Sequence, residues 1–267
     1  MSITLGSLQK TLLVPLWHRA QVTKARPELL NDPEAVNLVE RIDYDFSPFT
    51  QRFTPTDSLR SAARTRQFDD AFRAYISAHP YASIVNLGAG LDTAFYRVDS
   101  GSVEWYDLDL PDVITLRQRL LPEPKRVRYI AKSLFDTSWC DDIAHTDDGI
   151  FIFARGVLWF FEEEQVKHLL SSLADKVPEA ELACDACSKL GAPMVTNSLK
   201  SVGMTDVAVK WMMGDAQVVT RWDSRLKLID QTPVYSIPRD SVSEEQNVKH
   251  TERGDLVYAL SIVHLRV

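Results

Sequence analysis

Residues 84–97 read IVNLGAGLDTAFYR, and this stretch decides the fold. An apolar run ends at Gly88 and Gly90, and the residues that follow can begin a helix. Glycine permits a positive φ and leaves no Cβ between the backbone and a bound nucleotide, although a tight turn also uses glycine for purely local reasons. In an open parallel sheet, the ligand lies beyond the carboxyl end of such a strand. The stretch therefore predicts the first strand of a nucleotide-binding sheet.

From residue 83 onward, strand-like and helix-like stretches alternate. The strand candidates are SIVNLG, VEWYDLD, VRYIA, GIFIFARG and ELACDAC. Because these runs are continuously apolar, they predict an α/β fold whose parallel sheet is covered by helices on both faces. The final segment, LVYALSIVHLRV, follows no long crossover helix, so it predicts a strand that can pair antiparallel with the sheet.

Two helices are well specified by the sequence. Residues 58–79 place apolar side chains at three- and four-residue spacing, with Asp57 as the expected cap and Pro80 as the stop. The second helix follows Phe161 and begins with three glutamates, residues 162–164, whose charge is favourable at a helix N-terminus. Its predicted buried stripe consists of Val166, Leu169, Leu170, Leu173 and Val177.

The composition restricts the class of protein. The 267 residues, 45% of them apolar, are enough for one integrated unit, which we expect to divide into a helical cap at 1–80 and a core at 81–267 with an insertion around 205–250. The net charge of −7, without a basic stripe, argues against a nucleic-acid partner. No run is long enough to span a membrane, and the start lacks the pattern of a signal peptide, so we expect a cytoplasmic protein.

The cysteines predict neither a disulfide framework nor a metal site. Cys184 and Cys187 lie in an apolar run that reads as a strand, and Cys140 stands alone. A zinc site would need two further ligands at suitable spacing, which the sequence does not offer. We therefore expect three structural cysteines and no metal.

An acid follows the glycines by about 20 residues, the usual distance for a group that accepts hydrogen bonds from ribose hydroxyls. Asp109 ends the strand in WYDLDLP, where it could also cap the helix that Pro111 opens. A dinucleotide site would want a third glycine where this chain has Thr93, which weakens a pyrophosphate or nicotinamide interpretation. S-adenosylmethionine contains a ribose but no phosphate. Its carboxylate would need a cation, for which Arg64 and Arg66 are candidates unless they lie on a solvated helix face.

Several segments together resemble the leucine carboxyl methyltransferase family, in particular its bacterial branch similar to the tetracenomycin polyketide carboxyl O-methyltransferase. The matching segments are TLLVPLWHRA, NDPEAV, RIDYDFS, AARTRQFD, IVNLGAGLDTAFYR, WYDLDLP, GVLWFFEEEQV, VGM and WDSRLKLI. They occur in order over nearly the whole chain.

The resemblance implies S-adenosyl-L-methionine as cofactor and a class I methyltransferase (Rossmann-like) fold. That fold has a mostly parallel seven-stranded sheet, added N-terminal helices and a substrate-side insertion. It also implies that Arg64 grips the methionyl carboxylate, that Asp109 binds the ribose and that Arg19 supplies the N-terminal basic contact. The residues implied to line the cofactor are Gly88, Ala89 and Gly90.

Two positions depart from the family pattern. The family has an Asp-Leu pair facing adenine after the third strand, whereas this chain has Ser133 and Leu134, with Asp136 two residues later. The family's Glu before Gly-Val-Leu is here Arg155. Arg155 could form an ion pair with a nearby carboxylate, such as one of the glutamates at 162–164, or could orient an acidic substrate. A third possibility is a site that has lost its cofactor.

The expected reaction is methyl transfer to a small acid. A carboxylate is already ionised at pH 7 and needs no general base, whereas a phenol would need one, and no histidine–acid dyad is evident. We therefore favour an O-methyltransferase that forms a methyl ester on a polyketide-like carboxylic acid. The alternative is a methyltransferase-like protein that binds a ligand without transferring methyl. Aromatic candidates for the acceptor pocket are Trp17, Phe46, Phe49, Phe53, Trp159, Trp211 and Tyr235.

Overall fold

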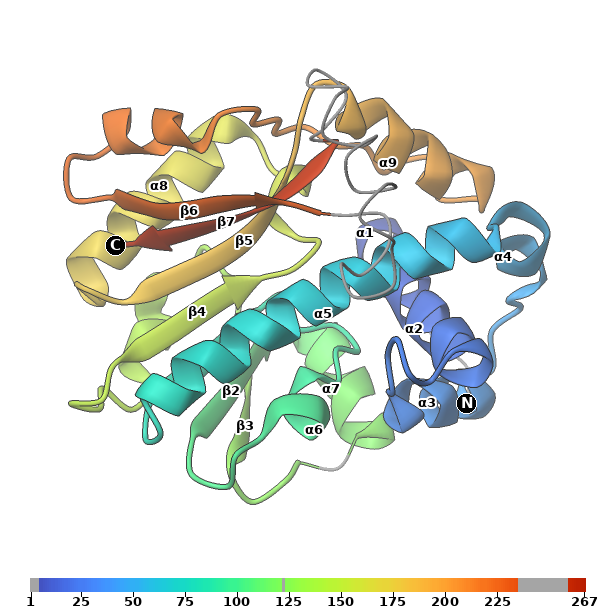
Figure 1. Ribbon diagram of the computed structural model, residues 1–267, viewed down its shortest axis with the longest axis horizontal. Coiled ribbons are helices and arrows are strands. Elements are labelled where there is room, and N and C mark those ends of the chain that lie inside the picture. The colour runs from blue at the N-terminus through green and yellow to red at the C-terminus, as the bar shows by residue number, and fades with distance from the viewer. Residues whose placement is uncertain (1–4, 122, 235–258) are drawn as a thin grey trace.

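The computed structural model describes residues 5–121, 123–234 and 259–267, and within them seven strands form one sheet. The strand order is β3-β2-β1-β4-β5-β7-β6 (Figure 1). The strands are β1 (Ser83–Leu87), β2 (Glu104–Asp109), β3 (Val127–Ala131), β4 (Ile150–Ala154), β5 (Glu181–Cys187), β6 (Lys227–Pro233) and β7 (Leu260–Arg266). Strands β1 to β5 pair in parallel, and β7 is antiparallel to both of its neighbours. The α/β expectation is confirmed, with a mixed sheet.

The helices cover both faces and one end of the sheet. They are α1 (Ser7–Lys10), α2 (Leu13–Ala25), α3 (Pro33–Arg41), α4 (Ser47–Arg52), α5 (Pro55–Ala78), α6 (Ala94–Val98), α7 (Pro111–Leu120), α8 (Glu163–Lys176) and α9 (Gly191–Ser201). Three short 3-10 helices are η1 (Thr137–Asp141), η2 (Leu158–Phe160) and η3 (Ala216–Arg221). Figure 1 shows the long helix α5 crossing one face, while α1 to α4 and α9 gather at one end.

Successive side chains along each strand point to opposite faces of the sheet, so each face has its own hydrophobic core. On one face, Phe68 and Phe72 of α5 pack with Trp105 of β2 and with Phe151 of β4. On the other face, the next strand residue, Tyr106, packs with apolar side chains of α8. The predicted stripe of α8 is confirmed, since all five of its residues are buried.

Helix starts differ slightly from expectation. Thr54 caps α5, and Asp57 occupies the third helical position, where its carboxylate accepts from the backbone N–H of Thr54 to close a capping box. The expected Asp57 cap is therefore wrong by three residues, because Pro55 already fits the first helical position. Glu162 likewise caps α8, so that only the next two glutamates lie in its first turn.

The division of the chain at residue 80 stays a prediction. The described residues before that point include α5, which packs directly on the sheet. None of the helices in the described ranges has the length and apolar character needed to cross a lipid bilayer.

Phe72 tests the α5 core. Its ring is fully buried, lies 4.4 Å from the ring of Phe153 between centroids and packs edge-on against Trp105. Truncation leaves a cavity, so we expect Phe72→Ala to lower the free energy of unfolding by about 3–5 kcal/mol in urea titrations. Tyr81, which is 67% exposed, is the control, and Tyr81→Ala should change stability by less than about 0.5 kcal/mol. Equal losses in both variants would contradict this core assignment.

Candidate functional site

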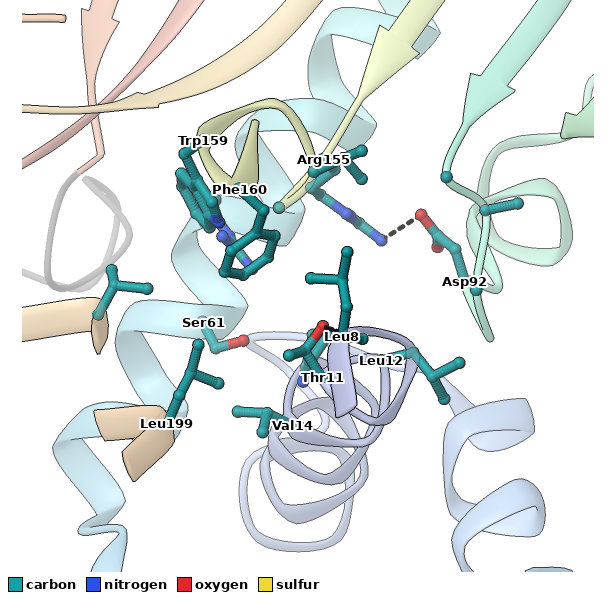
Figure 2. A pocket seen from close by; sticks show the side chains of 18 of the residues that line it. Leu8, Thr11, Leu12, Val14, Ser61, Asp92, Arg155, Trp159, Phe160 and Leu199 are labelled. Atoms are coloured by element: carbon teal, nitrogen blue, oxygen red, sulfur yellow. Dashed lines mark hydrogen bonds and ion pairs between the residues drawn. The ribbon is translucent and has the colours of Figure 1, made fainter. Parts of the chain in front are cut away.

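A large cavity lies at the point where the chain reverses its direction across the sheet. Strand β1 lies between β2 and β4, so successive strands spread to opposite sides from β1. In doubly wound sheets the ligand crevice lies at this switch point, beyond the carboxyl ends of the strands. The cavity has a volume of about 1080 Å³ and is lined by the turn after β1, the ends of β2 and β4, and side chains of α1, α2, α5 and α9 (Figure 2).

The turn after β1 depends on its glycines for two reasons. Gly88 has a φ of 68° and Gly90 a φ of 48°, both in the left-handed region that favours glycine. A Cβ on Gly88 would also lie 2.6 Å from Cγ2 of Val157, and one on Gly90 would lie 3.1 Å from Cβ of Leu12. Gly88, Ala89 and Gly90 of the turn line the cavity. The absence of a side chain at Gly88 and Gly90 is required by local packing and also leaves the backbone open to a ligand.

Asp109 closes the other side of this turn. Its Oδ2 accepts from the backbone N–H of Gly90 at 2.8 Å, and its Oδ1 accepts from that of Leu110 at 2.7 Å. The cap residue of α7 is Leu110, which makes no side-chain cap bond, so Asp109 is held by the turn and does not cap the helix. Burial raises the pKa of Asp109 to about 6, against the effect of the two N–H bonds. Each oxygen keeps acceptor capacity toward the cavity.

The carbonyl groups of the turn are held by two buried arginines. Nη1 of Arg117 donates to the carbonyl oxygens of Gly90 and Asp92 at 3.1 and 2.7 Å, and Nη2 of Arg19 donates to that of Leu91 at 2.9 Å. Arg117 is itself paired with Asp107 at 2.5 Å. The predicted cofactor residue Arg19 therefore lines the cavity while it also holds the turn.

A buried ion cluster joins the N-terminal helices to the turn. Oδ2 of Asp32 accepts from Nε of Arg19 at 2.8 Å, from Nη1 of Arg97 at 2.8 Å and from the hydroxyl of Thr93 at 2.6 Å. Arg97 makes two further bonds to Asp69 of α5, at 2.7 and 2.9 Å. The cluster fixes α2, α3, α5 and α6 against each other.

Arg64 lines the cavity from α5 and already has a protein partner. Its Nη1 donates to Oδ2 of Asp185 at 3.0 Å, and its guanidinium lies 5.5 Å from the ring centroid of Trp159. Asp185 also accepts from the backbone N–H of Gly156, and it was not among the predicted site residues because it lies inside the buried strand CDAC. Nε of Arg64 is buried and has no hydrogen-bond partner within the described ranges.

Arg155 forms an ion pair across the cavity, but not with the expected glutamates. Its Nη2 lies 2.6 Å from Oδ2 of Asp92, and Figure 2 marks this ion pair with a dashed line. Glu162 instead pairs with Lys210, because η2 carries the start of α8 away from the end of β4. Although burial acts in the opposite direction, Arg155 and the other nearby arginines hold the pKa of Asp92 well below its usual range. Nη1 of Arg155 is buried and lacks a hydrogen-bond partner among the residues described.

Some of the remaining predicted residues line the cavity and others do not. Ser133 and Leu134 line the cavity, whereas Asp136 caps η1 and is not part of the lining. Tyr235 lies outside the described residues. Among the other aromatic candidates, Trp159 lines the cavity, while Trp17, Phe46, Phe49, Phe53 and Trp211 pack in the hydrophobic cores.

Aliphatic side chains line the cavity together with the rings of Trp159, Phe160 and Phe161. The aliphatic residues are Leu8, Leu12, Val14, Met194, Val195 and Leu199. They come from α1, α2 and α9 and from the two-residue link between α1 and α2, and no residue of α9 was among the predicted site residues. The amphipathic pattern of α9 was the available signal, since Met194 is 54% exposed and Leu199 is buried.

Comparison with known proteins identifies relatives of this chain. A family described as leucine carboxyl methyltransferase matches residues 12–174. The tetracenomycin polyketide synthesis O-methyltransferase TcmP of Streptomyces glaucescens is 33% identical over 187 residues, 69% of this chain and 68% of that protein. An S-adenosyl-L-methionine-dependent methyltransferase of Gibberella zeae is 26% identical over 235 residues, 80% of this chain and 78% of that protein. The structure of the plantazolicin methyltransferase BamL, in complex with a substrate analog and SAH, has a TM-score of 0.53 at 12% identity and covers 96% of this chain and 98% of its own.

The doubly wound sheet, with its glycine turn and the acid at the end of β2, is thus a fold shared with methyltransferases. Within that class, the chain belongs to the leucine carboxyl methyltransferase family. The resemblance drawn from the sequence segments is confirmed.

The geometry of the turn can be tested at Gly88. Alanine there should cost about 1–2 kcal/mol for its left-handed backbone and a further ~1–3 kcal/mol for the overlap with Val157. In a Val157→Ala background the second contribution should disappear, so the loss caused by Gly88→Ala should fall to the backbone part alone. Urea unfolding of the four proteins in this double-mutant cycle measures the difference. A cost independent of residue 157 would contradict the close approach.

Proposed function

We propose that this protein is a class I S-adenosylmethionine-dependent O-methyltransferase that esterifies a small carboxylic acid. Membership of the leucine carboxyl methyltransferase family supports methyl transfer. The observation that carries the proposal is the cavity at the switch point, where the glycine turn and Asp109 face arginine side chains. Its volume of about 1080 Å³ lies at the upper end of the ~300–1,000 Å³ range typical of ligand pockets, as expected for a site that takes a cofactor and a small acceptor.

The cavity offers a suitable residue for each part of S-adenosylmethionine. Asp109 would accept hydrogen bonds from the ribose hydroxyls, because both of its oxygens face backbone donors and no cation pairs with it among the described residues. Nε of Arg64 would donate to the methionyl carboxylate, and Ser133 and Leu134 would lie toward the adenine. When bound, the sulfonium supplies a methyl group for a single in-line displacement. The protein then contributes by positioning the acceptor and excluding water.

The charges of the lining favour an acidic acceptor. The cations in it are Arg19, Arg60, Arg64, Lys132 and Arg155, and the acids are Asp57, Asp92 and Asp109. Arg19, Arg64 and Lys132 also pair with acids just outside the lining, namely Asp32, Asp185 and Asp142. We assign Arg155 to the acceptor carboxylate, because its Nη1 is buried and unpartnered while Asp92 holds the opposite edge of its guanidinium.

A carboxylate acceptor also suits the available bases. His18 lines the cavity and its Nδ1 lies 2.9 Å from the hydroxyl of Ser58. Burial lowers its pKa to about 4, which makes it a weak base for a phenol. A carboxylate arrives ionised at pH 7, so the protein needs only to orient it.

The second candidate function is ligand binding without methyl transfer. It is favoured by Arg155, a cation at the end of β4 where the family pattern has a glutamate and where a cationic cofactor would bind nearby. Calorimetric titration with S-adenosylmethionine and S-adenosylhomocysteine separates the candidates when it is followed by an assay of labelled methyl transfer to aromatic carboxylic acids. Release of the label in mild alkali would identify an ester. A flat titration with both compounds would exclude the proposed function.

The pKa of Asp109 predicts how cofactor binding depends on pH. Only the ionised carboxylate accepts from both ribose hydroxyls, so affinity for S-adenosylhomocysteine should fall as the pH drops through about 6. Between pH 7.5 and pH 5 we expect a loss of about 10-fold, measured by calorimetry. His18, with its pKa of about 4, stays neutral throughout this range. Asp109→Asn should bind weakly without this pH dependence, and an unchanged profile in that variant would contradict the assignment.

Arg155→Gln tests the acceptor contact. Loss of a charged hydrogen bond should weaken binding of an aromatic carboxylate by about 10- to 100-fold and leave the affinity for S-adenosylhomocysteine within about threefold. Arg60→Gln is the matched control, because Arg60 also lines the cavity but its side chain is 48% exposed and pairs with Asp57. Equal effects of the two substitutions would indicate a general charge effect and not a specific contact.

A further inference from the structure

Arg117 of α7 lies behind the glycine turn and is not part of the cavity lining. Its side chain is 1% exposed. Nη1 donates to the carbonyl oxygens of Gly90 and Asp92 at 3.1 and 2.7 Å, and Nη2 lies 2.5 Å from Oδ2 of Asp107. The guanidinium therefore connects the turn to β2. Because Arg117 does not reach the cavity, any effect that it has on a ligand must pass through the turn.

The acid that pairs with Arg117 is itself held in place. Asp107 is buried in β2, and its Oδ1 accepts from the side-chain amide of Asn86 at 2.9 Å and from the indole N–H of Trp105 at 3.0 Å. A carboxylate with these partners has one orientation, and the planar guanidinium that faces it is restricted in turn. The core of the sheet thus fixes the position of Arg117.

Gly90 links Arg117 to Asp109. The carbonyl oxygen of Gly90 accepts from Arg117, and its backbone N–H donates to Oδ2 of Asp109 at 2.8 Å. With a φ of 48°, Gly90 is a residue that could rotate readily if nothing held it. The guanidinium restrains this rotation and so keeps the N–H directed at Asp109. The orientation of the carboxylate at the end of β2 therefore depends on a side chain of α7.

The Arg117 cation also favours the ionised form of Asp109. Burial raises the pKa of Asp109 to about 6, whereas the N–H groups of Gly90 and Leu110, and after them the charge of Arg117, act to lower it. Only the ionised carboxylate can accept from both ribose hydroxyls. Orientation and charge thus act in the same direction.

The other charged groups around Asp109 have partners or face solvent. Asp112, in the first turn of α7, raises the pKa of Asp109 but is exposed. Lys132, beyond the end of β3, lines the same cavity and pairs with an acid outside the lining. Asp92 of the turn is held by the arginines around it. Arg117 is therefore the group behind the turn whose loss we expect to act most on Asp109.

We propose that Arg117 is a positioning residue for cofactor binding, which acts through Gly90 to orient Asp109 toward the ribose. The inference rests on the proposed role of Asp109 and deepens it by naming the side chain that controls this carboxylate from outside the cavity. Asp107, Asn86 and Trp105 complete a chain of contacts from the core of the sheet to the ribose site.

A double substitution tests the proposal without leaving a buried charge. Truncation of Arg117 alone would leave Asp107 buried and unpaired, so Arg117→Met is combined with Asp107→Asn. At pH 7.5 we expect the affinity for S-adenosylhomocysteine, measured by calorimetry, to fall by about 3- to 10-fold. The ionised form of Asp109 is the form that binds, so affinity is lost as the pH falls through its pKa. Without the cation this loss should begin at a higher pH than in the wild-type protein, a shift that a purely structural defect would not produce.

Arg117→Lys separates orientation from charge. An ammonium keeps the charge opposite Asp107, but it cannot reproduce the planar fork that serves one acid and two carbonyl groups. We expect the affinity for S-adenosylhomocysteine to fall by about threefold at pH 7.5, while the pH at which affinity is lost stays at the wild-type value. If the double variant does not fold, this variant decides alone: the expected loss supports the proposal and wild-type affinity overturns it.

The pair of Asp99 and Arg126 provides the matched control. Arg126 also donates to a backbone carbonyl, that of Val103 at 3.1 Å, but neither member of the pair lines the cavity. Asp99→Asn with Arg126→Met should leave both the affinity and its pH profile unchanged. An unshifted profile in the folded double variant at 107 and 117, or equal effects in the control, would overturn the proposal. Failure of the wild-type protein to bind S-adenosylhomocysteine would count against the proposed function instead.

Discussion

The interaction on which the rest of the structure depends is the three-way contact at Oδ2 of Asp32. One carboxylate oxygen accepts from Arg19 of α2, from Arg97 of α6 and from Thr93 after the glycine turn. Asp32 is 1% exposed, and a buried charge that loses its partner costs several kcal/mol. The N-terminal helices and the first βα unit therefore cannot separate without leaving charges unpaired. This constraint holds the N-terminal helices that line the cavity in place against the sheet.

The same cluster explains how the chain accommodates an arginine at position 155. Asp92 lies between Arg97 and Arg155, at 3.8 and 2.6 Å, so the cation at the end of β4 meets an acid that the turn after β1 supplies. Arg64 has a comparable arrangement with Asp185 on the far side. Arg64 and Arg155 each pair with a buried acid and keep a buried nitrogen without a hydrogen-bond partner among the described residues. Fixed guanidinium groups of this kind suit planar carboxylates better than flexible lysines would.

Local patterns predicted the fold well and the partners poorly. The pattern of apolar residues located β1 to β5, β7 and the α8 stripe, because each depends on neighbours in sequence, whereas β6 was not predicted. The antiparallel pairing of β7 was predicted because no long crossover helix precedes it. The pairs Arg64–Asp185 and Arg155–Asp92 depend on which strand ends meet across the sheet, and no spacing in the sequence encodes that. Among the aromatic candidates in the described residues, Trp159 lines the cavity and five pack in the cores. Large aromatic rings fill hydrophobic cores as readily as they line cavities, so the number of aromatic residues in the sequence could not show which of them line the cavity.

The carbonyl groups at positions 90, 91 and 92 are each held by a guanidinium, from Arg117 or from Arg19. A loop secured in this way has little conformational entropy left to lose when a small molecule docks against it. Docking against this turn therefore requires little ordering of its own main chain. The turn after β1 is therefore held in one conformation by contacts within the folded protein, before any ligand binds.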